Sequence, residues 1–391
     1  MKNILLTRRQ VIIGTGVIGL GSMLPFNLAF ASAPTEKRLM VVILRGAMDG
    51  LSAVIPYKDP RYVDIRGDVA MPQSDKAIID LDGYFAMHRS LGGLADLYKN
   101  KELIILHATA TPYRERSHFD AQDLLENGSD KPHLLNTGWL NRTVESLNNG
   151  TKAIAIGPAV PLVLKGDAPV SSWAPSILPS LDEDFLARVA HMYEKDTLLS
   201  KALEEGQMNN GTDMGNNGRK GQKAFVSMMD KAAEFLSAPG GARIASIDLG
   251  GWDTHANQGK ETGRLANTMD ILSEGITNFK SKMGTTWKNT AVLVVTEFGR
   301  TVRGNGSGGT DHGTGSVAFL MGGNVNGGRI IGEWPTLSKL YQDRDLYPAN
   351  DSRSLLRSTL NQHLGIHEDI LSQKIFPGSS QVPQFQKVFL G

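Results

Sequence analysis

Two short stretches of the chain place an acid beside a histidine just beyond an apolar run. Asp253 and His255 follow the run RIASIDLGG and are separated by one residue. In an extended loop, side chains two residues apart point the same way, so both could reach one ion. Asp311 and His312 follow a glycine-rich loop that starts soon after another apolar run. Carboxylates and imidazoles together are typical of a divalent-cation site. A capping aspartate with a surface histidine is the simpler alternative for the first pair.

Two further carboxylates also come at the ends of apolar runs. Glu297 ends the run AVLVVT, where a buried, unpaired carboxylate would carry a large energetic cost. It needs a cation, water or an arginine, and Arg300 is the nearest in sequence. Asp49 follows the first apolar run and lies close to glycines on both sides. It is either a metal ligand or a turn aspartate bonded to its own backbone.

A serine supplies a candidate nucleophile. Ser117 stands at the start of an expected helix, where unpaired N–H groups favour developing negative charge. Arg114 and Arg116 come just before it, and guanidinium groups bind phosphoryl and sulfuryl oxygens well. The pattern is compatible with attack by the Ser117 hydroxyl on such a group, with Arg114, Arg116 or Arg300 as oxygen clamps. A plain helix-capping serine is the alternative, with His118 and Asp120 as structural neighbours.

Apolar runs of strand length alternate with segments of helical spacing along the chain. The pattern predicts a three-layer α/β sandwich with a mostly parallel central sheet. Expected strands are 39–45, 102–108, 153–157, 243–251, 290–299 and 316–323, and expected helices are 90–100, 117–128, 262–282 and 352–365. Ligands bind outside the carboxyl ends of the strands in such sheets. We therefore expect the candidate residues to lie along one edge.

Composition limits the ligands and the partners. The chain has no cysteine, so one or two ions of Zn, Mn, Mg or Ca would be held by oxygen and nitrogen atoms. Its 391 residues include 41 basic and 40 acidic ones, for a net charge of +1. This balance gives no strong field for nucleic acid or an anionic membrane. One domain over 35–391 is favoured over two, with a flexible loop at 206–221.

The first residues predict export. Arg8 and Arg9 precede an apolar stretch interrupted by glycines, and Ala29 to Ala31 has the small-x-small form of a cleavage site. Residues 1–31 are therefore interpreted as a signal peptide for the twin-arginine translocase, cut after Ala31 or Ala33. A membrane anchor is the alternative. The mature protein is expected in the periplasm or secreted, with no stable membrane span.

Several motifs together resemble a known family. They are RGAMDGLSAVIPY, RERSHFDAQDLLENG, TGWLNR, GGWDTHANQ, TEFGRTVRGNGSGGTDHGTG and GGRIIGEWP. With the twin-arginine leader, this combination resembles the exported bacterial family catalogued as domain of unknown function 1501. The resemblance implies an alkaline-phosphatase-like fold but no established reaction.

The resemblance also implies roles for individual residues. Asp49 would bind one metal, Asp253 and His255 would bind another, and Ser117 would be the nucleophile. Glu297 falls where a strand-end aspartate is usual. Phe298 then stands where the family pattern has a histidine, so the usual Asp-His pair at the strand end is incomplete. Asp311 and His312 are either that Asp-His pair, displaced by the glycine-rich loop, or a separate feature. His312 would match the histidine that comes late in the family pattern. A complete set of ligands for two metals is not evident.

Two functions follow from these features. The first is an exported, metal-dependent hydrolase of phosphate or related esters, of phosphatase or phosphodiesterase type, acting on a small anionic ester or a polymer. The second is a non-catalytic module on a degraded phosphatase-like fold, which binds a glycan, a surface polymer or a partner protein. Phe298 in place of a ligand histidine favours the second.

Overall fold

The computed structural model describes residues 36–391, except 73, 75, 148, 149, 176–191, 194–198 and 200–221. The expected signal peptide at 1–31, its cleavage site at Ala31 or Ala33, and the expected loop at 206–221 lie outside the described residues. Residues Ala33–Gly391 group into one compact unit. No helix in the described ranges is both long and apolar enough to span a bilayer.

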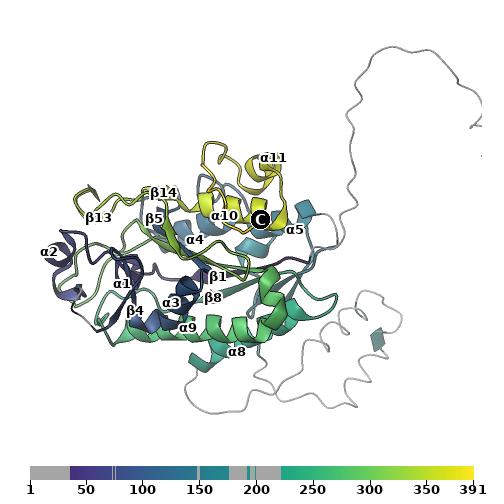
Figure 1. The fold of residues 1–391 in the computed structure, drawn as a ribbon. Helices are drawn as coiled ribbons and strands as arrows, with labels where there is room; N and C mark the ends of the chain where they lie inside the picture. Colours follow the sequence, from purple (N-terminus) through teal and green to yellow (C-terminus); the bar gives the residue numbers. More distant parts are fainter. Residues whose placement is uncertain are drawn as a thin grey trace, which may run out of the picture. The chain divides into compact units, whose positions relative to one another are not determined.

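A mixed, mostly parallel sheet forms the centre of the fold (Figure 1). Its strand order is β11-β5-β10-β9-β1-β8-β6-β7, and β14 pairs with β5. Only β10 runs antiparallel to its neighbours, β5 and β9, among these pairings. The strands are β1 Arg38–Leu44, β5 Leu103–Ala110, β6 Ala153–Ile156, β7 Val170–Trp173, β8 Ile244–Leu249, β9 Thr290–Thr296, β10 Ser316–Met321, β11 Arg329–Ile331 and β14 Asn350–Asp351. The predicted α/β class is confirmed.

Helices cover both faces of this sheet, which explains the continuous apolar runs. Met40 and Val42 of β1 pack into a core with α3, α8 and α9, whereas Leu39 and Val41 pack into a second core with α4, α5 and α10. A strand buried on both faces needs apolar residues at every position. Figure 1 shows α8 and α9 on one side of the sheet and α5 and α10 on the other. The helices are α3 Gly92–Lys99, α4 His118–Asn127, α5 Trp139–Leu147, α8 Gln222–Ser237, α9 Arg264–Met283 and α10 Ser352–Leu364.

Smaller elements fill the loops between these strands and helices. A three-stranded sheet joins β2 Val54–Ile55, β4 Ala86–His88 and β3 Ile78–Asp80, and a two-stranded sheet joins β12 Leu340–Tyr341 and β13 Asp345–Leu346. The short helices are α1 Gly50–Ala53, α2 Tyr62–Arg66, α11 Glu368–Ile370, η1 Gly67–Val69, η2 Arg89–Leu91, η3 Leu162–Leu164, η4 Gly284–Asn289 and η5 Leu371–Ile375.

The reversed direction of β10 determines where the glycine-rich loop lies. Because β10 is antiparallel to β5 and β9, it enters the sheet at the edge where the parallel strands end. The loop from Glu297 to Gly315 therefore folds back along that edge. Its two arms are joined by hydrogen bonds from Gly299 N–H to the Thr314 carbonyl (2.8 Å) and from Gly313 N–H to the Gly299 carbonyl (2.8 Å). A Cβ on Gly299 would lie 1.9 Å from the Gly315 oxygen, so this close approach requires glycine.

Candidate metal centre

Three imidazoles and one carboxylate meet at the carboxyl edge of the sheet. We call His118, Asp253, His255 and His312 the four-residue cluster. The His312 Nε2 atom lies 2.9 Å from Nε2 of His118 and 2.9 Å from Nε2 of His255. Asp253 Oδ1 lies 3.0 Å from His255 Nε2 and 3.3 Å from His312 Nε2, and Asp253 Oδ2 lies 3.7 Å from His118 Nε2. Ligand atoms of His118, Asp253 and His312 are close enough together to hold one metal ion.

The opposite ring nitrogens of the three histidines each face a hydrogen-bond acceptor. Nδ1 of His118 lies 2.8 Å from Glu297 Oε1, and Nδ1 of His255 lies 3.0 Å from Asp311 Oδ1. Nδ1 of His312 lies 3.0 Å from the Arg116 carbonyl oxygen. An ionised carboxylate or a carbonyl can only accept, so each Nδ1 must carry the hydrogen and donate.

These tautomers leave a lone pair on each Nε2 of a neutral ring. Three Nε2 lone pairs and a carboxylate then converge, and such an arrangement is repulsive unless a cation, either a metal ion or a proton shared between two rings, sits among them. Burial lowers the pKa of His312 and thus favours its neutral form. Histidines that ligate metals usually donate the other N–H to a carboxylate or a carbonyl. The cluster has this pattern at all three rings.

Glu297 orients His118 from the end of β9 instead of facing the centre of the cluster. Its Oε1 accepts hydrogen bonds from Gly46 N–H (2.8 Å), Gln122 Nε2 (3.0 Å) and His118. Burial by itself would raise the pKa of Glu297, but the hydrogen bonds from His118, Gln122 and the backbone outweigh it and lower the pKa. Glu297 is therefore an ionised acceptor. The simple Glu297–Arg300 pair is absent from the ion pairs of the described residues.

Arg300 instead holds Asp253. The Arg300 side chain is buried, and its Nη1 donates to Asp253 Oδ1 while Nε donates to the Thr310 hydroxyl at 3.2 Å. Burial would raise the pKa of Asp253, but the hydrogen bond and charge of Arg300 lower it overall. Oδ1 is thus engaged by the guanidinium, and Oδ2 is the oxygen that remains for an ion.

Phe298 supplies a packing surface for two of the imidazoles. Its ring stacks on His118 with centroids 4.9 Å apart, and it lies 5.4 Å from the ring of His312. Phe298 therefore packs against the cluster, a role that its sequence position did not indicate. His118, the first residue of α4, provides a third imidazole beside His255 and His312, although its sequence context favours a structural neighbour of Ser117. The signal for it was its position directly after Ser117, at a helix start that follows a strand end.

Asp49 is not brought into the cluster. Its Oδ2 accepts from Arg66 Nη2 (2.6 Å), Gln258 Nε2 (2.9 Å) and the Ser52 hydroxyl (2.8 Å). Burial would raise the pKa of Asp49, but the charge and hydrogen bond of Arg66 lower it. Asp49 also caps α1, because its Oδ1 accepts from Ser52 N–H. We therefore leave Asp49 out of the proposed ligand set.

The other candidate catalytic residues lie at different places. Ser117 is the N-cap residue of α4 by its backbone angles, yet its side chain makes no capping hydrogen bond, and it directly precedes His118. Arg114 turns to its own loop, where Nη1 donates to the carbonyls of Thr111 and Tyr113. Arg116 contributes its carbonyl to His312, and its Nε donates to Asp345 at 2.8 Å.

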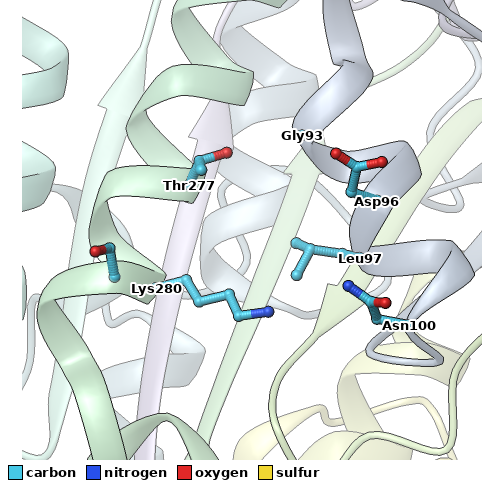
Figure 2. A pocket seen from close by; sticks show the side chains of 7 residues that line it. Gly93, Asp96, Leu97, Asn100, Thr277 and Lys280 are labelled. Carbon is cyan, nitrogen blue, oxygen red and sulfur yellow. The ribbon is translucent and has the colours of Figure 1, made fainter.

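Solvent reaches the side chains of the cluster. The side chains of Asp253 and His255 are 43% and 45% exposed, so a substrate could approach them. A separate groove of about 260 Å³ lies between α3 and α9, and Figure 2 shows the Asp96, Thr277 and Lys280 side chains that line it. This groove contains no member of the cluster. The candidate site is therefore the exposed cluster at the carboxyl edge.

The importance of Glu297 as an orienting group is testable. The Glu297→Gln variant should bind the metal about 10–100-fold more weakly, because a neutral amide is a poorer acceptor for the His118 Nδ1–H. Metal affinity measured by competition with a chromogenic chelator would show this. Glu333→Gln, at an exposed position, is the matched control. An unchanged affinity in Glu297→Gln would mean that His118 does not depend on this contact.

The fold and the site define an α/β protein with a candidate His/Asp metal centre at the carboxyl edge of its sheet. The chain belongs to the family described as protein of unknown function (DUF1501), which matches residues 36–373. The expected family resemblance is therefore confirmed. No curated protein matches the chain.

Solved structures with a similar arrangement include three proteins at low identity. The C-terminal periplasmic domain of EcEptC from Escherichia coli is 12% identical, with 91% of this chain and 89% of that chain covered and a TM-score of 0.43. BT1596, a 2-O GAG sulfatase, is 11% identical, with coverages of 89% and 73% and a TM-score of 0.45. A putative sulfatase from Bacteroides thetaiotaomicron is 10% identical, with coverages of 90% and 74% and a TM-score of 0.43.

Proposed function

We propose that this protein is a metal-dependent hydrolase of phosphate or related esters that works with one divalent ion. Nε2 of His118, His255 and His312 and Oδ2 of Asp253 would hold the ion. The observation that supports this proposal is the convergence of the three Nε2 atoms, each with its Nδ1 fixed by an acceptor. A ligand set rich in imidazoles binds zinc better than it binds magnesium or calcium. It also binds zinc better than manganese.

The bound ion would polarise the ester oxygen and stabilise developing negative charge. The residues of the chain would do the rest. Ser117 is the proposed nucleophile because it stands beside His118 at the start of α4. Its oxygen would bond to the phosphorus or sulfur atom as the alcohol leaves with a proton, and water would then release the phosphate or sulfate from Ser117. Arg300 would act by holding Asp253 in place.

Export by the twin-arginine translocase is part of the proposal. Residues 1–31 would direct the protein across the inner membrane, and the domain over 35–391 would act in the periplasm or outside the cell. This route carries folded proteins, which suits a domain that takes up its metal first. The absence of cysteine from the chain suits an oxidising compartment.

Metal content and turnover test the central claim together. Protein purified without added metal should carry close to one equivalent of a divalent ion, measured by elemental mass spectrometry, and should hydrolyse an aryl phosphate or an aryl sulfate. Protein that binds no added zinc or manganese would contradict the proposal.

One observation favours the non-catalytic alternative. Asp49, which the family resemblance implies as a ligand for a further ion, is bound by the buried guanidinium of Arg66. A site that keeps only part of the expected ligand set could bind a glycan or a surface polymer without turnover. Protein that retains one equivalent of metal but hydrolyses neither ester would support this second function.

The role of Ser117 separates two forms of the hydrolase. Ser117→Ala should lower kcat by several orders of magnitude and leave the metal content unchanged, because Ser117 is not among the proposed ligands. Single-turnover kinetics with an aryl ester would measure the loss, and Ser338→Ala, at an exposed position, is the control. Retention of activity in Ser117→Ala would mean that an activated water attacks the ester.

A further inference from the structure

A second cavity opens on the same edge of the sheet as the cluster. It has a volume of about 280 Å³ and lies where β6 and β8 end. Ile156, Pro161 and Met228 provide apolar walls, and Arg45 and Asp248 provide polar ones. We call this cavity the β6–β8 pocket. Its mixed lining is suited to a ligand that has both carbon–hydrogen faces and polar groups.

The polar lining includes a hydroxyl without a hydrogen-bond partner in the part of the chain that the structure describes. Ser246 lines the β6–β8 pocket, its residue is 1% exposed, and its Oγ makes no hydrogen bond with the described part of the chain. Buried polar groups are nearly always hydrogen-bonded, because an unpaired one carries a desolvation cost. A ligand with a hydroxyl or another polar group would satisfy this atom.

The charges around the pocket disfavour an anion. Nε of Arg45 donates to Asp248 Oδ2 at 2.9 Å, and Nη1 of Arg45 donates to Glu126 Oε1 at 2.6 Å. One guanidinium is thus shared between two carboxylates, so the surroundings are on balance negative. Asp248 Oδ1 accepts no hydrogen bond from the described residues, and its side chain is 40% exposed. The pocket therefore presents acceptors to an incoming ligand and suits neutral hydrogen-bond donors.

The pocket and the cluster are physically adjacent. Arg45 is followed by Gly46, whose N–H bonds to Glu297, and a Cβ on Gly46 would lie 2.6 Å from the Asp253 nitrogen. Gln122 contacts both Arg45 (3.2 Å) and Glu297 (3.0 Å). Asp248 lines the pocket near the end of β8, and Asp253 of the cluster follows the end of the same strand. One substrate of moderate size could span both.

We propose that the β6–β8 pocket is the subsite for the alcohol portion of the substrate, and that this portion is a neutral, hydroxyl-bearing group such as a sugar or a polyol. This inference rests on the proposed ester hydrolysis for its role, but the binding of a neutral sugar can be measured without metal or turnover. The anionic ester group would lie at the cluster, and the hydroxyl groups would meet Ser246 and Asp248.

Saturation-transfer NMR with a panel of methyl glycosides of glucose, galactose, mannose and N-acetylglucosamine tests the inference directly. At least one glycoside should bind the full-length protein. Ala159→Trp, an exposed lining position, should fill the pocket and weaken that binding at least tenfold. Ala238→Trp is the matched control, because Ala238 lines a different cavity at the opposite end of β6.

Ser246→Ala gives a second and milder variant. It removes a hydroxyl that has no hydrogen-bond partner among the described residues, so folding should be retained. Binding of the glycoside should weaken about five- to tenfold, the equivalent of one net hydrogen bond. The inference is overturned if no glycoside binds, if Ala159→Trp and Ala238→Trp bind equally well, or if a charged glucuronate binds more tightly than the neutral sugars. Metal content, measured on the same samples, reports separately on the proposed hydrolase.

Discussion

Replacing His312 with alanine is expected to remove the proposed metal ion from the protein and to abolish the proposed ester hydrolysis. His312 is the central member of the cluster, with its Nε2 2.9 Å from both of the other imidazoles. The loss of metal affinity should exceed the roughly hundredfold upper range for removing an outer hydrogen bond, because a ligand itself is lost. Elemental mass spectrometry after dialysis and kcat/KM with an aryl ester would measure the two effects.

His367→Ala is the matched control for this variant. The His367 side chain is 73% exposed, lies 3.3 Å from Asp369 and is not a member of the cluster. Because His312 is partly exposed, His312→Ala should remain folded, which circular dichroism would verify. A folded His312→Ala protein that keeps its full metal content would remove His312 from the site.

The protonation of the His312 imidazole should determine how metal retention depends on pH. Burial lowers the pKa of His312, so this imidazole stays neutral to a lower pH than an ordinary histidine. Metal should be released as the pH falls and protons compete for the Nε2 lone pairs.

Of the substitutions proposed for this protein, Asp49→Ala should cause the largest loss in the free energy of unfolding. Asp49 and Arg66 form an ion pair of 2.6 Å with both side chains almost fully buried. Removing one partner leaves the other charge buried and unpaired, which costs about 3–5 kcal/mol. Arg66 also donates to the carbonyls of Thr301 and Val302, so its displacement would disturb the glycine-rich loop. Urea unfolding would measure the change in the free energy of unfolding.

Asp369→Ala, at an exposed side chain, controls for the loss of a negative charge. The pKa of Asp49 is lower in the folded protein than in the unfolded chain, where it is near the ordinary value of about 3.9. The ionised Asp49 carboxylate therefore makes its full contribution to the free energy of unfolding at pH values above the pKa of the unfolded chain. This contribution is lost as the pH falls through the pKa that Asp49 has in the folded protein. Asp49→Ala should lack this part of the acid sensitivity. A loss of under about 1 kcal/mol would show that the pair contributes little.

The sequence allowed the sheet, and the edge that carries the candidate site, to be predicted for a clear physical reason. Strands such as β1 are buried on both faces, so their apolar runs are continuous and easily recognised. Polar residues directly beyond such runs must lie at the carboxyl edge. Asp253, His255 and His312 were expected there, and the structure brings them together.

The sequence did not indicate which of the acidic residues would face the centre of the cluster and which would orient a histidine. A carboxylate beside a histidine can be a ligand or an acceptor, and the choice depends on which ring nitrogen faces the centre. The hydrogen-bond partner of each ring decides this, as Glu297 does for His118. Glu297 and Asp311 accept from Nδ1 atoms, whereas Asp253 presents its oxygens to Nε2 atoms. Asp49 pairs with Arg66 and does not join the cluster. Arg66 belongs to a different element, and no local sequence pattern indicated this pairing.

The direction of β10 has a consequence for how the site assembles. β9 and β10 are consecutive in the chain and pair antiparallel, so they and the intervening loop can form as a local hairpin. Pairing between nearby segments loses less loop entropy and proceeds faster than pairing between distant ones. Glu297, Asp311 and His312 would thus be in place early, while His118 and Asp253 arrive from remote segments. We expect ion capture to be among the last events of folding, so nascent protein would mature at a rate set by long-range docking.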